Sequence, residues 1–142
     1  MHLVSLVKQL SSSKITKELR DRASRNDRLI LSGGNRTTKA LISSAIAHID
    51  NKSILVLVPR LEDANRWLSL LEVCGWSNPL LYPSCEVSPY APQGRTNEIA
   101  WGQMQVLSQL IEDDNNPKAI VATEKSLQPH LPPKDKFKNK CI

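Results

Sequence analysis

Near the N-terminus, apolar residues recur at the spacing of an α-helix. Four of them occupy positions i, i+3, i+4 and i+7, and so share one helix face: Leu3, Leu6, Val7 and Leu10. Three serines then interrupt the pattern, and the last of them, Ser13, suits the N-cap of a second helix over Lys14–Ser24. We therefore expect a helical leader over residues 1–27 that packs against the segment that follows.

From Arg28 onward, short apolar runs alternate with segments of helical spacing. Four runs have the length and composition of strands: Leu29–Leu31, Ser53–Pro59, Leu80–Tyr82 and Ala119–Thr123. The run over 53–59 contains no alternating polar residues, so we expect it to be buried on both faces of a sheet. Strands that alternate with helices predict an α/β fold with a parallel sheet and right-handed crossovers.

The segments between these runs have the periodicity of amphipathic helices. The predicted helices and a last helical turn cover residues 41–49, 61–74, 97–112 and 126–131. Gly75 is placed to end the second of these helices, and Thr96 is placed to cap the third. These elements give a module over 28–131.

The segment Arg28–Ile49 has the strand, turn and helix order of a phosphate-binding loop. The full pattern is a glycine, four residues and then Gly-Lys-Ser/Thr. Gly33 and Lys39 stand in their places, and Gly34 lies in the loop between them. Thr38 replaces the second glycine of the pattern, and Ala40 replaces the hydroxyl residue.

Both replacements weaken the chemistry that this pattern supports. Thr38 adds a branched side chain where the backbone has to close on a phosphate, and Ala40 has no oxygen for Mg²⁺. We therefore expect no ATP turnover, and a turn capped by Thr37 or Thr38 explains the glycines more simply. Weak anion binding by Lys39 at the helix N-terminus stays open as an alternative.

Composition and charge narrow the class of protein. The chain has 142 residues, of which 40% are hydrophobic and 23% charged, as expected for one globular domain. Much of its net charge of +5 comes from the Lys-rich stretch over 132–142, which we expect to be a disordered tail. Nucleic-acid binders usually place basic residues beside aromatic ones, and this sequence lacks that interleaving.

Cysteine and histidine do not form the spacings of a metal site. The three cysteines and three histidines are scattered along the chain: Cys74, Cys85, Cys141, His2, His48 and His130. We expect reduced thiols, no bound metal and no cofactor. The N-terminal segment is interrupted by Lys8 and is too short for a signal peptide, and no run reaches transmembrane length. These features favour a soluble cytoplasmic protein without membrane contact.

A proline-rich loop over Tyr82–Glu98 is the longest stretch without periodicity, and loops of this length are often functional. Its candidate interaction residues are Glu86, Pro89, Tyr90 and Glu98. No histidine or nucleophile accompanies the two glutamates, so they are better explained as residues that fix the loop and cap a helix than as catalysts.

Aromatic side chains offer a second candidate surface for a partner. Tyr90, Trp67, Trp76 and Trp101 could gather into one patch. Helical spacing makes core packing the better explanation for Trp67, whereas the pattern leaves Trp101 undecided.

Several stretches together resemble a known family. They are, in order, SGGNRTTKALISSAI, ILVLVPRLEDANRWLSLL, LLYPSCEVSPYAPQGRTNEI and AIVATEKSLQPHLPP. They resemble the N-terminal module of bacterial transcription-repair coupling factor, which is itself similar to the first domain of the excision-repair helicase UvrB. The most specific match is the proline-rich loop, with Glu86, Pro89-Tyr90 and Glu98-Ile99 in sequence. The resemblance covers residues 1–137.

This resemblance implies a RecA-like, P-loop NTPase-like fold with a three-layer parallel sheet, incomplete in this chain and preceded by the helical leader. It also implies a vestigial phosphate loop at Gly33, Gly34 and Lys39, and a docking or regulatory role without catalysis. The parent family is an ATP-dependent DNA translocase that displaces stalled RNA polymerase and recruits the excision-repair machinery. Its partners are RNA polymerase, UvrA and double-stranded DNA, and ATP with Mg²⁺ serves its motor domains.

The chain also departs from that family. It contains no UvrA-docking subdomain, polymerase-binding domain or helicase motor, and Asp113-Asp114 lies in a predicted turn rather than after a strand as in a Walker B site. We therefore interpret the chain as a non-catalytic N-terminal fragment of a coupling factor. Two alternatives remain: an ATP-binding P-loop protein or UvrB-type helicase fragment, and a small nucleic-acid-binding module.

Overall fold

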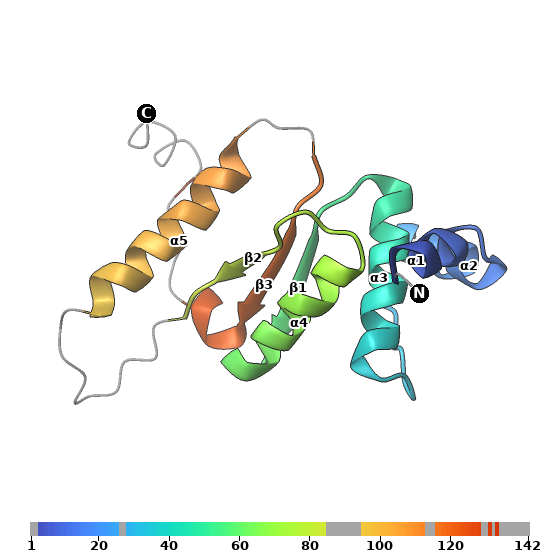
Figure 1. The fold of residues 1–142 in the computed structure, drawn as a ribbon, viewed down its shortest axis with the longest axis horizontal. Helices are drawn as coiled ribbons and strands as arrows, with labels where there is room; N and C mark the ends of the chain where they lie inside the picture. Colours follow the sequence, from blue (N-terminus) through green and yellow to red (C-terminus); the bar gives the residue numbers. More distant parts are fainter. Residues whose placement is uncertain are drawn as a thin grey trace.

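A computed structural model describes most of the chain (Figure 1). The described residues are 3–25, 28–84, 95–112, 116–128, 131 and 133. Their elements are α1 (Leu3–Ser11), α2 (Lys14–Ser24), α3 (Arg36–Asp50), β1 (Ile54–Val58), α4 (Leu61–Val73), β2 (Leu80–Tyr82), α5 (Arg95–Ile111), β3 (Ala119–Thr123) and the short 3-10 helix η1 (Glu124–Leu127). The tail over 134–142 lies outside the described residues.

The three strands form one parallel sheet in the order β1-β3-β2. Val56 of β1 and Leu81 of β2 both align with Val121 of β3, so β3 is the central strand. The fold is therefore α/β with a parallel sheet, as the alternation of strands and helices predicts.

Helices cover the two faces of this sheet to different extents (Figure 1). Val121 points to the face covered by α4, where it joins the main core of apolar residues from β1, α3 and α4. The next residue of β3, Ala122, points to the opposite face and packs with Tyr82 of β2 and Val106 of α5. On this second face α5 lies against β2.

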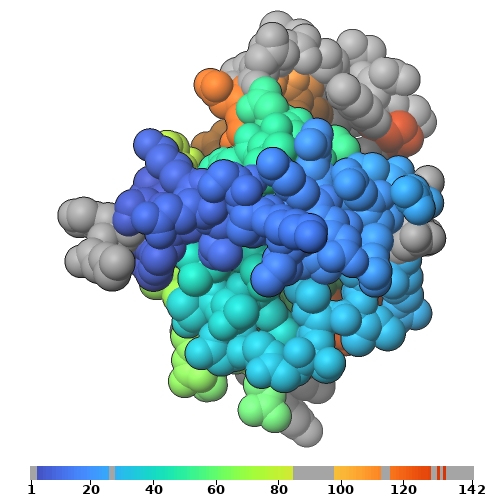
Figure 2. Space-filling model, turned by 90° about the vertical axis from the view of Figure 1, so that its right-hand side faces the viewer, coloured from blue at the N-terminus to red at the C-terminus, as the bar shows by residue number. Residues whose placement is uncertain are grey.

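The two N-terminal helices lie across α3 (Figure 2). The buried side chain of Val7 joins the main core, and an ion pair of 2.5 Å links Arg20 of α2 to Asp50 at the end of α3. The Ser13 side chain accepts a hydrogen bond of 3.2 Å from the Thr16 backbone amide. The helix over Lys14–Ser24 and its Ser13 cap are thus confirmed.

The predicted strand at Leu29–Leu31 is wrong. These residues are described but lie outside the sheet, and 81% of the Ile30 side chain is exposed. A strand exists only through its hydrogen-bonded ladder, and three apolar residues in a row do not specify a partner for it. The described part of the chain therefore has three strands rather than four.

The expectation that the run over 53–59 is buried on both faces is also wrong. Leu55 and Leu57 of β1 remain 54% and 52% exposed, whereas Val58 is buried. The cause is tertiary, because α5 covers the second face at β2 and does not extend over β1.

Two helix boundaries differ from the predicted ones. Helix α5 begins at Arg95, so Thr96 lies inside it instead of capping it. The final turn, η1, begins before Ser126 because the Thr123 hydroxyl accepts a hydrogen bond of 3.3 Å from the Ser126 amide. Shifts of one or two residues are usual at helix ends, because Ser and Thr occur both as caps and in the first turn of a helix. None of the helices in the described ranges is both long and apolar enough to cross a membrane.

Replacing Leu71 by alanine tests the main core. Leu71 of α4 is fully buried, so Leu71→Ala should lower the free energy of unfolding by about 2–5 kcal/mol through lost contacts and a cavity. Val73 in the same helix is 49% exposed, and Val73→Ala should cost less than about 1 kcal/mol. Urea denaturation followed by circular dichroism measures both variants. Equal costs would contradict the placement of α4 on the sheet.

Candidate functional site

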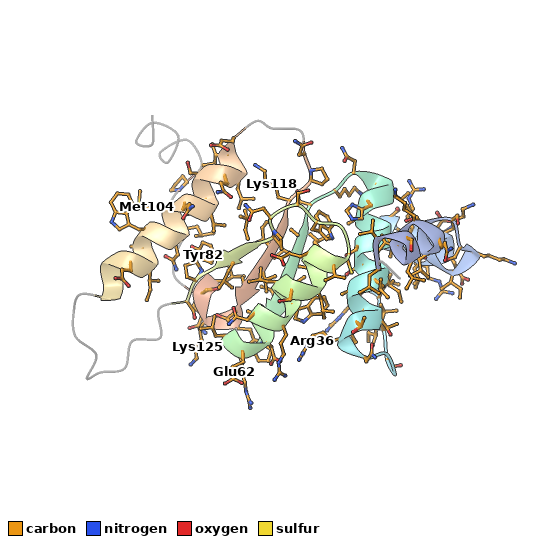
Figure 3. All side chains as sticks on the ribbon, in the orientation of Figure 1. Arg36, Glu62, Tyr82, Met104, Lys118 and Lys125 are labelled. Atoms are coloured by element: carbon orange, nitrogen blue, oxygen red, sulfur yellow. The ribbon has the colours of Figure 1, made fainter. Side chains whose placement is uncertain are left out.

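The loop that holds Gly33, Gly34 and Lys39 lies at the end of the sheet where the strands finish. Arg36 opens α3 directly after the loop, and its guanidinium binds the Asp63 carboxylate in the first turn of α4 at 2.5 Å. Helix α4 begins shortly after β1 ends, which places the loop beside the carboxyl end of that strand. Figure 3 shows Arg36 and Glu62 at this end of the molecule and Lys118 at the other. Parallel α/β proteins usually bind ligands at the carboxyl ends of their strands.

The turn into α3 is made by Gly33 and capped by Asn35. Gly33 has a φ of 79°, a left-handed conformation that favours glycine. The Asn35 side-chain oxygen accepts hydrogen bonds from the Thr38 backbone amide at 2.8 Å and from the Thr38 hydroxyl at 2.9 Å. The cap is therefore Asn35, and the predicted caps Thr37 and Thr38 are wrong. Asparagine is a favoured N-cap, so the sequence did carry this signal.

This cap uses one of the backbone amides that an anion at this helix end would need. A phosphate at a helix N-terminus is held by free backbone amides of the first turn, and here the Thr38 amide already donates to Asn35. The Thr38 side chain also lies against the turn, because a Cβ built on Gly34 would be 3.5 Å from its Cβ and Cγ2 atoms. The Thr38 side chain therefore contacts Gly34 across the turn, and the turn itself is exposed.

The remaining residues of the motif point to the same conclusion. Lys39 is exposed on the first turn of α3, whereas Ala40 is completely buried in the main core. A hydroxyl at position 40 would thus face apolar side chains rather than a bound ion. Arg36, which could add positive charge, is held by Asp63. Within the described ranges, no three His, Cys, Asp or Glu side chains are grouped as a metal site.

Of the proline-rich loop over Tyr82–Glu98, the structure describes only the two ends. Glu98 lies exposed in the first turn of α5, while Glu86, Pro89 and Tyr90 lie outside the described residues, as does Cys85. Of the four candidate interaction residues, the structure therefore describes only Glu98.

The tryptophans occupy two different environments. Trp67 is partly buried against the main core, which confirms the packing role predicted for it. Trp76 is buried in the same core, and its indole N–H donates to the Ser44 hydroxyl at 2.9 Å. Trp101 is 72% exposed on α5, so the three rings do not form one exposed aromatic patch.

A hollow of about 570 Å³ lies at the opposite end of the sheet, where β2 and β3 begin. Its wall includes His48, whose ring stacks on Trp76 with centroids 4.5 Å apart, and the side chains of Asn78, Glu112 and Lys118. The Lys118 amine donates to the Gln109 backbone carbonyl at the end of α5. This lining combines residues from three distant segments, so no spacing in the sequence could have indicated it.

One nucleophilic side chain, Cys74, is buried rather than presented to substrate. It lies at the end of α4 in the main core and contacts Ser44. Burial raises the pKa of the Cys74 thiol above its ordinary value of 9.0, and the hydrogen bond with Ser44 lowers it by less. The thiol is therefore protonated at neutral pH and unsuited to nucleophilic attack.

No family model, curated protein or solved structure matches this chain. The fold and the geometry of the loop at Gly33 therefore carry the functional argument.

The buried thiol makes stability depend on alkaline pH. Above pH 9.0 the unfolded thiol loses its proton while the buried thiol keeps it. Deprotonation stabilises the unfolded state relative to the folded state, so the free energy of unfolding falls as pH rises. The slope from this group is at most about 1.4 kcal/mol per pH unit. Urea denaturation at several pH values from neutral upward measures it, and Cys74→Ala, as the control, should show a flatter dependence. An identical slope in both proteins would contradict this assignment.

Proposed function

We propose that this chain is a non-catalytic docking module of RecA-like fold, corresponding to the UvrB-like N-terminal module of a transcription-repair coupling factor. The observation that carries the proposal is the turn at the start of α3, where Asn35 caps the helix through the Thr38 amide and hydroxyl and Ala40 is buried in the main core. A module of this kind keeps the shape of a nucleotide-binding domain but has lost the groups that bind phosphate and metal.

The position of the loop supports this interpretation. A degenerate phosphate loop is expected at the carboxyl end of a parallel sheet, at the N-terminus of a helix, and Gly33–Lys39 lies in that place. The parallel order of β1, β3 and β2 agrees with a RecA-like module, and the third layer of that fold is represented by α5.

The proposed role is to bind and to regulate within a cytoplasmic bacterial repair motor. In the parent family the motor domains use ATP and Mg²⁺. They hydrolyse ATP, translocate on double-stranded DNA and displace RNA polymerase. Recruitment of UvrA belongs to a neighbouring subdomain. This chain contributes an α/β body in which Asn35 caps the helix at the former nucleotide site.

Nucleotide binding tests the turn at the start of α3 directly. Titration of the full chain with a fluorescent ATP analogue and Mg²⁺ should show no saturable binding, and Lys39→Ala should behave identically, because Lys39 contacts no ligand. The alternative reading as an ATP-binding enzyme predicts Mg²⁺-dependent binding that Lys39→Ala abolishes. That result would overturn the proposal.

Replacement of the corresponding module in a bacterial coupling factor tests the repair role. The chimera should restore preferential repair of ultraviolet damage in the transcribed strand, measured strand by strand after irradiation. The same chimera with Lys39→Ala should restore repair equally, since the lysine has no part in catalysis. A chimera that folds and accumulates normally but leaves both strands repaired at the same rate would refute the assignment.

A further inference from the structure

Strand β1 is an edge strand whose surroundings differ on its two faces. Ile54, Val56 and Val58 point to the main core under α4. Leu55 and Leu57 point to the other face and are more than half exposed. β1 pairs with β3 on one side, and no described strand lies on its other side. Exposed apolar edge strands are ready templates for another strand.

The backbone groups of the two leucines face this open edge. The Ile54 amide donates to the Lys118 carbonyl at 2.9 Å, on the side of β3. Amide directions alternate along a strand, so the N–H and C=O groups of Leu55 and Leu57 point away from β3. The backbone donors and acceptors of these two residues are thus placed to form hydrogen bonds with a further strand.

Positive charges mark both ends of this edge. Lys52 and Arg60 flank the uncharged stretch 53–59, and both are exposed. The Lys52 amine lies 3.7 Å from Asp50, whose other carboxylate oxygen is bound by Arg20 at 2.5 Å. Within the described ranges, Arg60 has no ion pair. The two cations are eight positions apart, roughly 26 Å along an extended chain.

These charges disfavour a second copy of the chain as the occupant. Two copies of β1 can pair their outward leucine groups in an antiparallel ladder centred on Val56, with Leu55 opposite Leu57 of the other copy. That register also places Lys52 opposite Arg60 at both ends of the seam. Like charges directly opposite each other destabilise a strand pair, so the charge pattern opposes self-association.

We propose that β1 binds an extended segment of another protein as an added edge strand. The segment that fits has apolar side chains at alternate central positions, which cover Leu55 and Leu57, and an acidic residue at each end, which meets Lys52 and Arg60. Main-chain hydrogen bonds to the two leucines supply the ladder, and the end charges supply the selectivity. This surface is separate from the turn at the start of α3, and the inference does not rest on the proposed function.

Labelled peptides provide the test with the full chain. The probe is fluorescein-ESTVTVTSE, whose two glutamates have the spacing of the two cations and whose two valines lie at odd offsets from them, on the face of Leu55 and Leu57. Its matched control is KSTVTVTSK. Fluorescence anisotropy at low ionic strength should show at least about tenfold tighter binding of the acidic peptide, with the difference shrinking as salt is added. The double variant Lys52→Glu/Arg60→Glu should reverse the preference.

A second pair of peptides tests the backbone ladder without altering the protein. N-methylation of alternate amides removes donors from one edge of the probe strand, and shifting the methyl groups by one residue removes them from the other edge. One of the two methylated peptides should bind like the unmodified probe, and the other should lose binding, because only one edge meets Leu55 and Leu57.

Several results would overturn this inference. They are equal affinity for the acidic and basic peptides, equal loss of binding for both methylated peptides, and no detectable binding of any peptide. Sedimentation of the free chain as a dimer that Leu57→Lys dissociates would also overturn it, because a second copy would then occupy the edge.

Discussion

The central position of β3 is the constraint on which the rest of the molecule depends. Its parallel ladder holds β1 on one side and β2 on the other, and Ala119, Val121 and Ala122 are almost completely buried. Small and β-branched side chains on this strand let α4 approach one face while α5 approaches the other. Because β3 comes last among the strands, the sheet is complete only when residues far apart in the sequence have met.

The same arrangement explains the geometry of the turn at Gly33 that precedes α3. Helix α3 packs through Ala40, Ala45 and Ala47 against the main core, which draws its first turn towards α4. Arg36 and Asp63 then close the gap between the two helix starts, and Asn35 satisfies the turn from within. The turn is therefore stabilised by side chains of the chain itself.

Local signals in the sequence were most accurate where a few neighbouring residues determine the structure. Ser13 and Thr16 bond across one helical turn, and Gly75, with a φ of 98°, follows the end of α4. The sequence also shows directly that Thr38 and Ala40 depart from the phosphate-loop pattern, whatever the fold. The residue that caps α3, Asn35, was missed because three residues within four positions, Asn35, Thr37 and Thr38, are all suited to a helix cap, and only the geometry distinguishes them.

The sequence by itself therefore determined the class of fold, the helices and the strands of β1, β2 and β3, since these follow from periodicity within short segments. Only the tertiary structure decided that Leu29–Leu31 stays outside the sheet, that Leu55 and Leu57 remain exposed, and that Trp76 meets Ser44 and Arg36 meets Asp63. Each of these depends on which distant segments come together. Strand pairing and burial depend on such contacts, and an apolar run by itself does not specify which segments it will contact.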